Sequence, residues 1–267
     1  MATPSEITPE QKPKEAYEIM HEQIETGLKE HNRSDLGLFL SSLSAGLEVG
    51  FSILIIGVIY TLFKNDSSTG QLAVMMALVY PIGYIFVIIG RSELFTEHTT
   101  LATLTVMNGQ ATLRSLAKIW VIIYVGNLVG GYLFGSILVL FNGEMHLIGK
   151  DFFYFVSEKM VKYSVSATLI SSIMAGWLMG MLSWLLSSAQ DTFSRVIMIF
   201  LVTFVISIAG LHHCIVGSIE VFIAFFAEAN KMTWSQVLKF QGLATLGNII
   251  GGVILVAVVK FAHSKRH

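Results

Sequence analysis

The sequence predicts an all-α membrane protein with six transmembrane helices, two of them broken. Of its 267 residues, 54% are hydrophobic and only 13% are charged, about half the charged fraction of a typical soluble domain. The apolar segments at roughly 71–108 and 193–230 are each interrupted by a polar stretch. About 20 apolar residues suffice to cross the hydrocarbon core, so each segment predicts one crossing made of two half-helices. The four unbroken predicted spans are about 36–62, 115–140, 164–187 and 238–262.

The polar N-terminal region precedes the first predicted span. Residues 1–12 contain Pro4 and Pro9 and predict a loose tail. From Pro13 onward, apolar residues recur at three- and four-residue spacing among Glu and Lys, which predicts an amphipathic helix on the membrane surface or against the bundle. These apolar residues are Tyr17, Met20, Ile24 and Leu28. No cleavable signal peptide is expected, so the first span would act as its own insertion signal.

The two breaks are the most informative stretches of the chain. The first runs from Gly90 to His98, and the second from Ala209 to Gly217. Polar groups at membrane depth are costly, and irregular backbone is tolerated there only where it is buried in protein or lines a cavity. One interpretation is a pair of kinked helices whose polar groups are satisfied by protein. The other is a transport site, because broken helices meet near the midplane in inverted-repeat transporters.

An internal repeat relates the two halves of the chain. Gly46 and Gly176 lie in matching Ala-Gly-x-x-x-Gly motifs of the first and fourth spans. Asn127 and Asn248 lie in matching Gly-Asn-x-x-Gly-Gly motifs of the third and sixth spans. The four residues are expected to serve helix packing, because small residues in such motifs allow helices to pack closely in lipid. Each half has three spans, so the second half must enter the membrane from the opposite side, and we expect a 3+3 inverted repeat. The predicted repeats are residues 36–141 and 163–262.

Six crossings place both termini on one side of the membrane. With the N-terminus inside, more Lys and Arg residues fall on the cytoplasmic side than on the outside, which favours cytoplasmic termini. The expected organisation is a cytoplasmic N-terminal tail and amphipathic helix at 1–35, a transport domain at 36–262 and a cytoplasmic tail at 263–267.

The breaks carry the groups that suit an anion pathway. Half-helix N-termini present free N–H groups and partial positive charge. Thr96 offers a hydroxyl, His213 a titratable ring, and Phe95 an apolar collar. A neutral His213 could pass a proton without holding a fixed charge in the pore. Arg91 would either pair with Glu97 or attract anions.

The motifs of the six predicted spans resemble those of the formate/nitrite transporter family. The resemblance covers about residues 36–262 and includes both breaks and both Gly-Asn-x-x-Gly-Gly motifs. The sequences Gly90-Arg-Ser-Glu-Leu-Phe-Thr-Glu-His98 and Leu47-Glu-Val-Gly-Phe-Ser-Ile-Leu54 resemble its divergent YfdC-like branch. The resemblance implies an aquaporin-like fold and a pentamer with one pore per subunit in a bacterial-type inner membrane. It also implies transport of small monovalent anions or their acids, such as formate, nitrite, hydrosulfide, lactate or acetate.

The resemblance also assigns roles to individual residues. Phe95 and Thr96 match the family's constriction phenylalanine and pore threonine, and His213 matches its central histidine. His212 and Gly217 replace the Glu and Asn that the family usually carries around that histidine, and a family asparagine falls on Gly176. The vestibule lysine has Lys159 or Lys162 as its approximate counterpart.

Two other functions fit parts of the sequence. A sensor or scaffold on the same fold would explain the presence of His212 and Gly217. The side chain of His212 points away from that of His213, so His212 is expected to face a protein partner. A membrane-embedded metal enzyme would use His212, His213 and Glu220. Neither a metal, a cofactor nor an enzymatic activity is expected. Cys214, the single cysteine, excludes an internal disulfide, and the net charge of −1 argues against a nucleic-acid partner.

Overall fold

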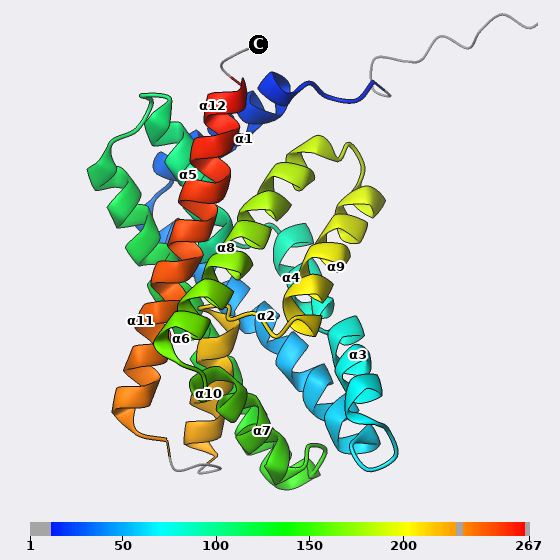
Figure 1. Cartoon of the computed structure of the whole chain (residues 1–267). Helices are drawn as coiled ribbons and strands as arrows, with labels where there is room; N and C mark the ends of the chain where they lie inside the picture. Colours follow the sequence, from blue (N-terminus) through cyan, green and yellow to red (C-terminus); the bar gives the residue numbers. More distant parts are fainter. Residues whose placement is uncertain (1–11, 228–231, 265–267) are drawn as a thin grey trace, which may run out of the picture.

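The computed structural model describes residues 12–227 and 232–264, and all regular elements in these ranges are helices (Figure 1). This confirms the predicted all-α class. Residues 1–11 of the expected N-terminal tail, residues 265–267 of the expected tail at 263–267, and the end of the second broken segment at 228–230 lie outside the described residues. Residues 263 and 264 belong to the last helix.

The helices follow the predicted spans closely. The first half contains α1 (Ala16–His31), α2 (Asp35–Phe63), α3 (Thr69–Val79), α4 (Pro81–Ile89), α5 (Phe95–Met107) and α6 (Leu113–Met145). The second half contains α7 (Lys150–Val161), α8 (Val165–Ser188), α9 (Thr192–Ile208), α10 (Val216–Phe226), α11 (Trp234–Ile250), a π-helical segment η2 (Gly251–Val258) and α12 (Val259–Ser264).

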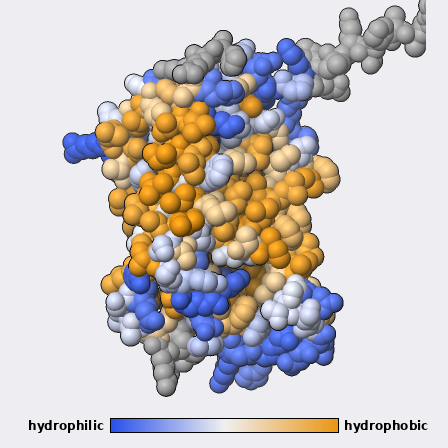
Figure 2. Space-filling model, viewed as in Figure 1, coloured by the Kyte–Doolittle hydropathy of each residue, from blue (hydrophilic) through white to orange (hydrophobic). Residues whose placement is uncertain are grey.

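Five helical segments of the described chain are long and apolar enough to cross a membrane. They are α2, α3 with α4, α6, α8, and α11 with η2 and α12. The remaining predicted span is divided between the shorter apolar helices α9 and α10. Figure 2 shows an apolar band across the visible face of the molecule between two hydrophilic ends, as expected for a protein embedded in a bilayer.

The starts of the long helices are fixed by polar caps. A side-chain oxygen at the N-cap accepts a hydrogen bond from a backbone N–H of the first turn and so satisfies one of its unpaired donors. The residues that do this are Ser34, Ser68, Thr112, Ser164, Asp191 and Thr233. By contrast, α5 and α10 begin inside the protein after Leu94 and Ile215, and neither residue caps its helix with its side chain. Their first turns must therefore be satisfied from elsewhere in the bundle.

Glycines bring the paired helices into close contact. A Cβ atom at Gly46 of α2 would overlap the carbonyl oxygen of Asn127 on α6. A Cβ atom at Gly176 of α8 would overlap the carbonyl oxygen of Asn248 on α11 in the same way. The same contact therefore occurs between the first and third spans of each half.

The N-terminal helix α1 packs against α5 and α8, which places it against the bundle. Its buried face is centred on Ile19, Gln23 and Ile24, and the Gln23 side-chain amide donates to the Ser183 carbonyl at 2.8 Å. Tyr17 was expected on the apolar face but is 57% exposed, because the buried face is turned toward a polar anchor on α8. Figure 1 shows α1 and α12 at the same end of the bundle, as an even number of crossings requires.

Replacing Gly46 by alanine is expected to destabilise the fold, because the new methyl group has no space against α6. Overpacking of this kind typically costs about 1–3 kcal/mol. The matched control is Gly143→Ala, at a helical glycine of α6 whose Cβ position has no atom within 4 Å. Thermal unfolding in detergent should show a lower midpoint for Gly46→Ala only. Equal midpoints for the two variants would contradict the close α2–α6 contact.

Candidate functional site

The two breaks meet in the interior of the bundle. Thr96, in the first turn of α5, and His213, between α9 and α10, are both buried. Their Oγ1 and Nε2 atoms lie 2.9 Å apart. A hydroxyl group and an imidazole ring from opposite halves of the chain are thus joined in an otherwise apolar region.

The hydrogen bonds of His213 define its tautomer. The backbone N–H of Val216 donates to Nδ1 at 3.3 Å, so Nδ1 is an acceptor. A neutral ring with an acceptor at Nδ1 carries its hydrogen on Nε2. Nε2–H therefore donates to Thr96 Oγ1, and the hydroxyl hydrogen of Thr96 is not used in this bond.

Two asparagine side chains form hydrogen bonds with the unpaired backbone groups of the breaks. Asn127 of α6 accepts from the Phe95 backbone N–H at 2.8 Å and donates to the carbonyl oxygens of Glu93 and Ser42, both at 2.8 Å. The first free N–H of α5 and a carbonyl of the break are thus satisfied by one amide group. Sequence analysis assigned Asn127 to helix packing and missed this function, because the target of an amide depends on the tertiary structure.

Asn248 of α11 does the same for the second break. It accepts from the Cys214 N–H at 2.9 Å and donates to the carbonyls of Ser172 at 2.8 Å and His212 at 3.1 Å. The two asparagines therefore make the same three kinds of bond: to an N–H within the break, to a carbonyl oxygen within the break, and to a carbonyl oxygen of the neighbouring helix. The repeated Gly-Asn-x-x-Gly-Gly motif is the sequence signal that could have indicated this.

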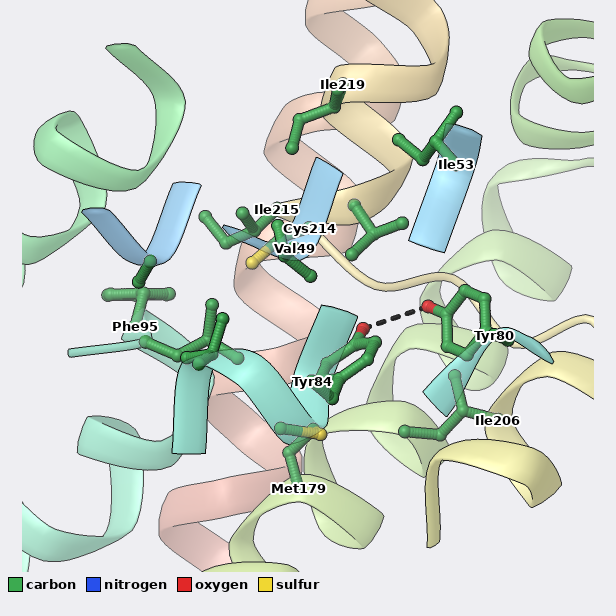
Figure 3. Packing of buried hydrophobic residues seen from close by; sticks show 14 of the residues in the cluster. Val49, Ile53, Tyr80, Tyr84, Phe95, Met179, Ile206, Cys214, Ile215 and Ile219 are labelled. Atoms are coloured by element: carbon green, nitrogen blue, oxygen red, sulfur yellow. Dashed lines mark hydrogen bonds between the residues drawn. The ribbon is translucent and has the colours of Figure 1, made fainter. Parts of the chain in front are cut away.

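Aromatic side chains surround the meeting point. Phe95 is buried and contacts Tyr124 edge-to-face, with ring centroids 5.0 Å apart. The Tyr84 ring packs edge-on against His213 at 5.7 Å. Figure 3 shows the hydroxyl groups of Tyr80 and Tyr84 hydrogen-bonded at 2.9 Å among aliphatic side chains. Sequence analysis missed this tyrosine pair, which adds hydroxyl groups to the predicted apolar collar.

A small cavity, here called the α7 cavity, reaches His213 from the side of α7. Its volume is about 40 Å³, enough for a few water molecules or one small solute. Lys159 and Glu220 line it together with His213 and Tyr80. Lys162 lies instead with its Nζ 5.3 Å from the centre of the Tyr163 ring, so Lys159 is the one of the two lysines that lines the cavity.

A larger cavity of about 500 Å³, here called the α1 cavity, lies between α1, the first break and the ends of α8 and α9. Arg91 lines it and adopts a left-handed backbone conformation, with φ of 62°. Arg91 and Glu97 do not form an ion pair within 4.0 Å in the described residues. The ion pairs of this region join Arg33 to Glu30 and Glu93, at 3.2 and 3.0 Å, and Glu93 to His98.

His212 packs against α8, whereas Gly217 packs between α7 and α11 at the edge of the α7 cavity. Nδ1 of His212 lies 2.7 Å from the Ser171 hydroxyl. A Cβ at Gly217 would lie 2.6 Å from Cζ of Phe240 and 2.9 Å from Sδ of Met160. There is no room for a larger side chain at 217 in this arrangement. Among the residues that the structure describes, no group of three or more His, Cys, Asp or Glu side chains could hold a metal ion.

Comparisons with known proteins agree with this fold. A model of the formate/nitrite transporter family matches residues 17–262. The inner membrane protein YfdC of Escherichia coli (strain K12) is 30% identical over 264 residues, which cover 96% of this chain and 81% of that protein. The formate channel FocA of Haemophilus influenzae is 23% identical over 253 residues, which cover 86% of this chain and 88% of that protein.

Solved structures of channels share the architecture. A channel described as an FNT family ion channel matches with a TM-score of 0.81 at 21% identity, covering 92% of this chain and 98% of that chain. A pentameric formate channel with formate bound matches with a TM-score of 0.69 at 22% identity, covering 85% and 96%. The predicted resemblance is confirmed, and the metal-enzyme alternative is set aside because these relatives are channels and transporters. The chain is an integral membrane protein that belongs to the formate/nitrite transporter family.

Proposed function

We propose that the protein is a channel or transporter for small monovalent anions or their conjugate weak acids, of the size of formate, nitrite or acetate. The observation that carries this proposal is the buried hydrogen bond between Thr96 and His213, made where two broken helices meet. The formate channels among its relatives support the same class of solute.

The surroundings of Thr96 and His213 favour passage of the neutral acid. A bare anion in an apolar, water-poor region has a penalty of several kcal/mol, which the neutral acid avoids. Lys159 would concentrate anions in the α7 cavity, whereas Phe95 and its aliphatic neighbours oppose the passage of charge. The solute would thus cross with a proton, accepting a hydrogen bond from the Thr96 hydroxyl at the constriction. His213 holds that hydroxyl in position.

Acid uptake into proteoliposomes tests this mechanism. Flux should rise as external pH falls and should carry little net current. His213→Phe is expected to abolish it, because it leaves the buried Thr96 hydroxyl unpaired beside an apolar ring. Thr96→Val should reduce it several-fold through loss of a hydrogen bond of about 1 kcal/mol. The matched control is Thr203→Val, since Thr203 is also buried but bonds only to Ile199 of its own helix.

Several results would contradict the mechanism. Large pH-independent anion currents would show that charge crosses the constriction. Undiminished flux in His213→Phe would remove the histidine from the pathway. A folded wild-type protein that carries none of a panel of small acids would favour a sensor or scaffold instead.

We further propose an inverted repeat with both termini in the cytoplasm. The matching bonds of Asn127 and Asn248 support the repeat. In this topology the α1 cavity faces the cytoplasm and the α7 cavity faces the outside. Cysteines replacing Asp66 or Lys162 should react with an impermeant thiol reagent from outside, and those replacing Gln110 or Gln190 only from inside. The native Cys214 is buried and can be kept. Labelling with the opposite sidedness would overturn the orientation.

We also propose that the chain assembles as a homopentamer with one pore per subunit. The pentameric formate channel supports this state, as do the many exposed apolar side chains on the outer helix faces. Native mass spectrometry in mild detergent should detect five copies of the 29.4 kDa chain. A stable monomer in every detergent would refute the pentamer.

A further inference from the structure

The α7 cavity contains a carboxyl group that the pathway described so far does not use. Glu220 lies on α10, seven residues after His213, and both residues line this cavity. Its side chain lines the cavity with Lys159 and His213 and is 9% exposed. A carboxyl group is an unfavourable neighbour for an approaching anion unless it is protonated, so its presence here needs an explanation.

His213 is poorly placed to exchange protons with this cavity. Its Nδ1 already accepts from the Val216 N–H, and its Nε2–H donates to Thr96. A proton could bind to Nδ1 only if the bond to Val216 at the start of α10 were broken. The ring therefore acts as a fixed donor to Thr96, and another group must exchange the proton that accompanies the solute.

Glu220 is the acidic side chain that faces the cavity in the described residues. The ionisable groups around it are Lys159 from α7, Tyr80 at the end of α3, Tyr84 from α4 and His213. On the α6 side, Tyr132 is bonded to the Ser218 hydroxyl at 2.6 Å. Within the described chain neither Lys159 nor Glu220 forms an ion pair within 4.0 Å. The ammonium group is thus free to hold an anion beside the carboxyl group.

We propose that Glu220 donates the proton that converts an incoming carboxylate, held by Lys159, into its neutral acid in the α7 cavity. The O–H bond of the Glu220 carboxyl group breaks, and an O–H bond forms on the solute. The negative charge remains on Glu220 until a hydronium ion from the aqueous side restores its proton and leaves water. The neutral acid then passes Thr96. Donor and acceptor are then both carboxyl groups, which favours monocarboxylates as the solute class.

The inference rests on the proposed function and is tested by formate uptake into proteoliposomes. Glu220→Gln keeps the size of the side chain but cannot donate the proton. Its maximal rate should fall about tenfold or more and lose its dependence on pH, while its KM for formate should not rise because Lys159 is retained. The matched control is Glu158→Gln, next to Lys159 but exposed outside the cavity; it should behave like wild type.

Two further variants separate proton donation from a structural role. Glu220→Asp should recover part of the rate and the pH dependence. His213→Gln, which can still donate to Thr96 but cannot titrate, should keep the wild-type pH profile at a reduced rate. Melting curves of each variant establish that it is folded. Wild-type protein should also show a formate-dependent infrared difference band of a carboxyl group, absent in Glu220→Gln.

The results have distinct meanings. Wild-type flux and pH dependence in folded Glu220→Gln would overturn the assignment of Glu220 but leave the proposed function intact. Loss of pH dependence in His213→Gln would return proton exchange to the histidine. If Glu220→Gln does not fold, absence of the carboxyl band from wild-type protein would overturn the assignment. Absence of any acid flux in wild type would overturn the proposed function itself.

Discussion

The structure depends on hydrogen bonds to the backbone N–H and C=O groups that the two helix breaks leave unpaired inside the bilayer. A break in a membrane helix leaves N–H and C=O groups without water to bond, and each buried unsatisfied group costs about 1–3 kcal/mol. Asn127 and Asn248 meet this requirement, because each amide bonds an N–H within a break and two carbonyl oxygens. Glycines at 46 and 176 allow the helices that carry these amides to approach closely enough.

The chemistry of the site follows from this arrangement. With both breaks held, Thr96 and His213 come within hydrogen-bond distance, and the Val216 N–H fixes which nitrogen of the ring donates. In the proposed function, a ring fixed in this way positions the Thr96 hydroxyl for the solute. Lys159 and Arg91 lie away from this pair, at the two cavities. The proposed mechanism therefore separates recognition of the anion from passage of its acid in space.

Much of the fold could be predicted from the sequence, because the length and apolarity of a segment determine whether it forms a membrane helix. Thr96 and His213 could be singled out because polar residues are rare within membrane helices. Other features depend on three-dimensional packing. The buried face of α1 is set by the bond from Gln23 to α8, so periodicity alone placed Tyr17 wrongly. Residue spacing could not show which of Lys159 and Lys162 lines the α7 cavity, because the two lysines are less than one helical turn apart. The Tyr80–Tyr84 hydrogen bond and the hydrogen-bond partners of both asparagines could not be predicted, because they depend on how the helices pack.

The most direct test of this account is formate flux in Asn127→Leu and Asn248→Leu, which keep the side-chain size but remove every bond to the breaks. Asn142→Leu is the matched control, because Asn142 also lies on α6 and bonds backbone, but at Ile148, outside the breaks. The account predicts that both break variants lose most of their flux while Asn142→Leu retains it. Full flux through a folded Asn127→Leu or Asn248→Leu protein would contradict the claim that these amides hold the transport site together.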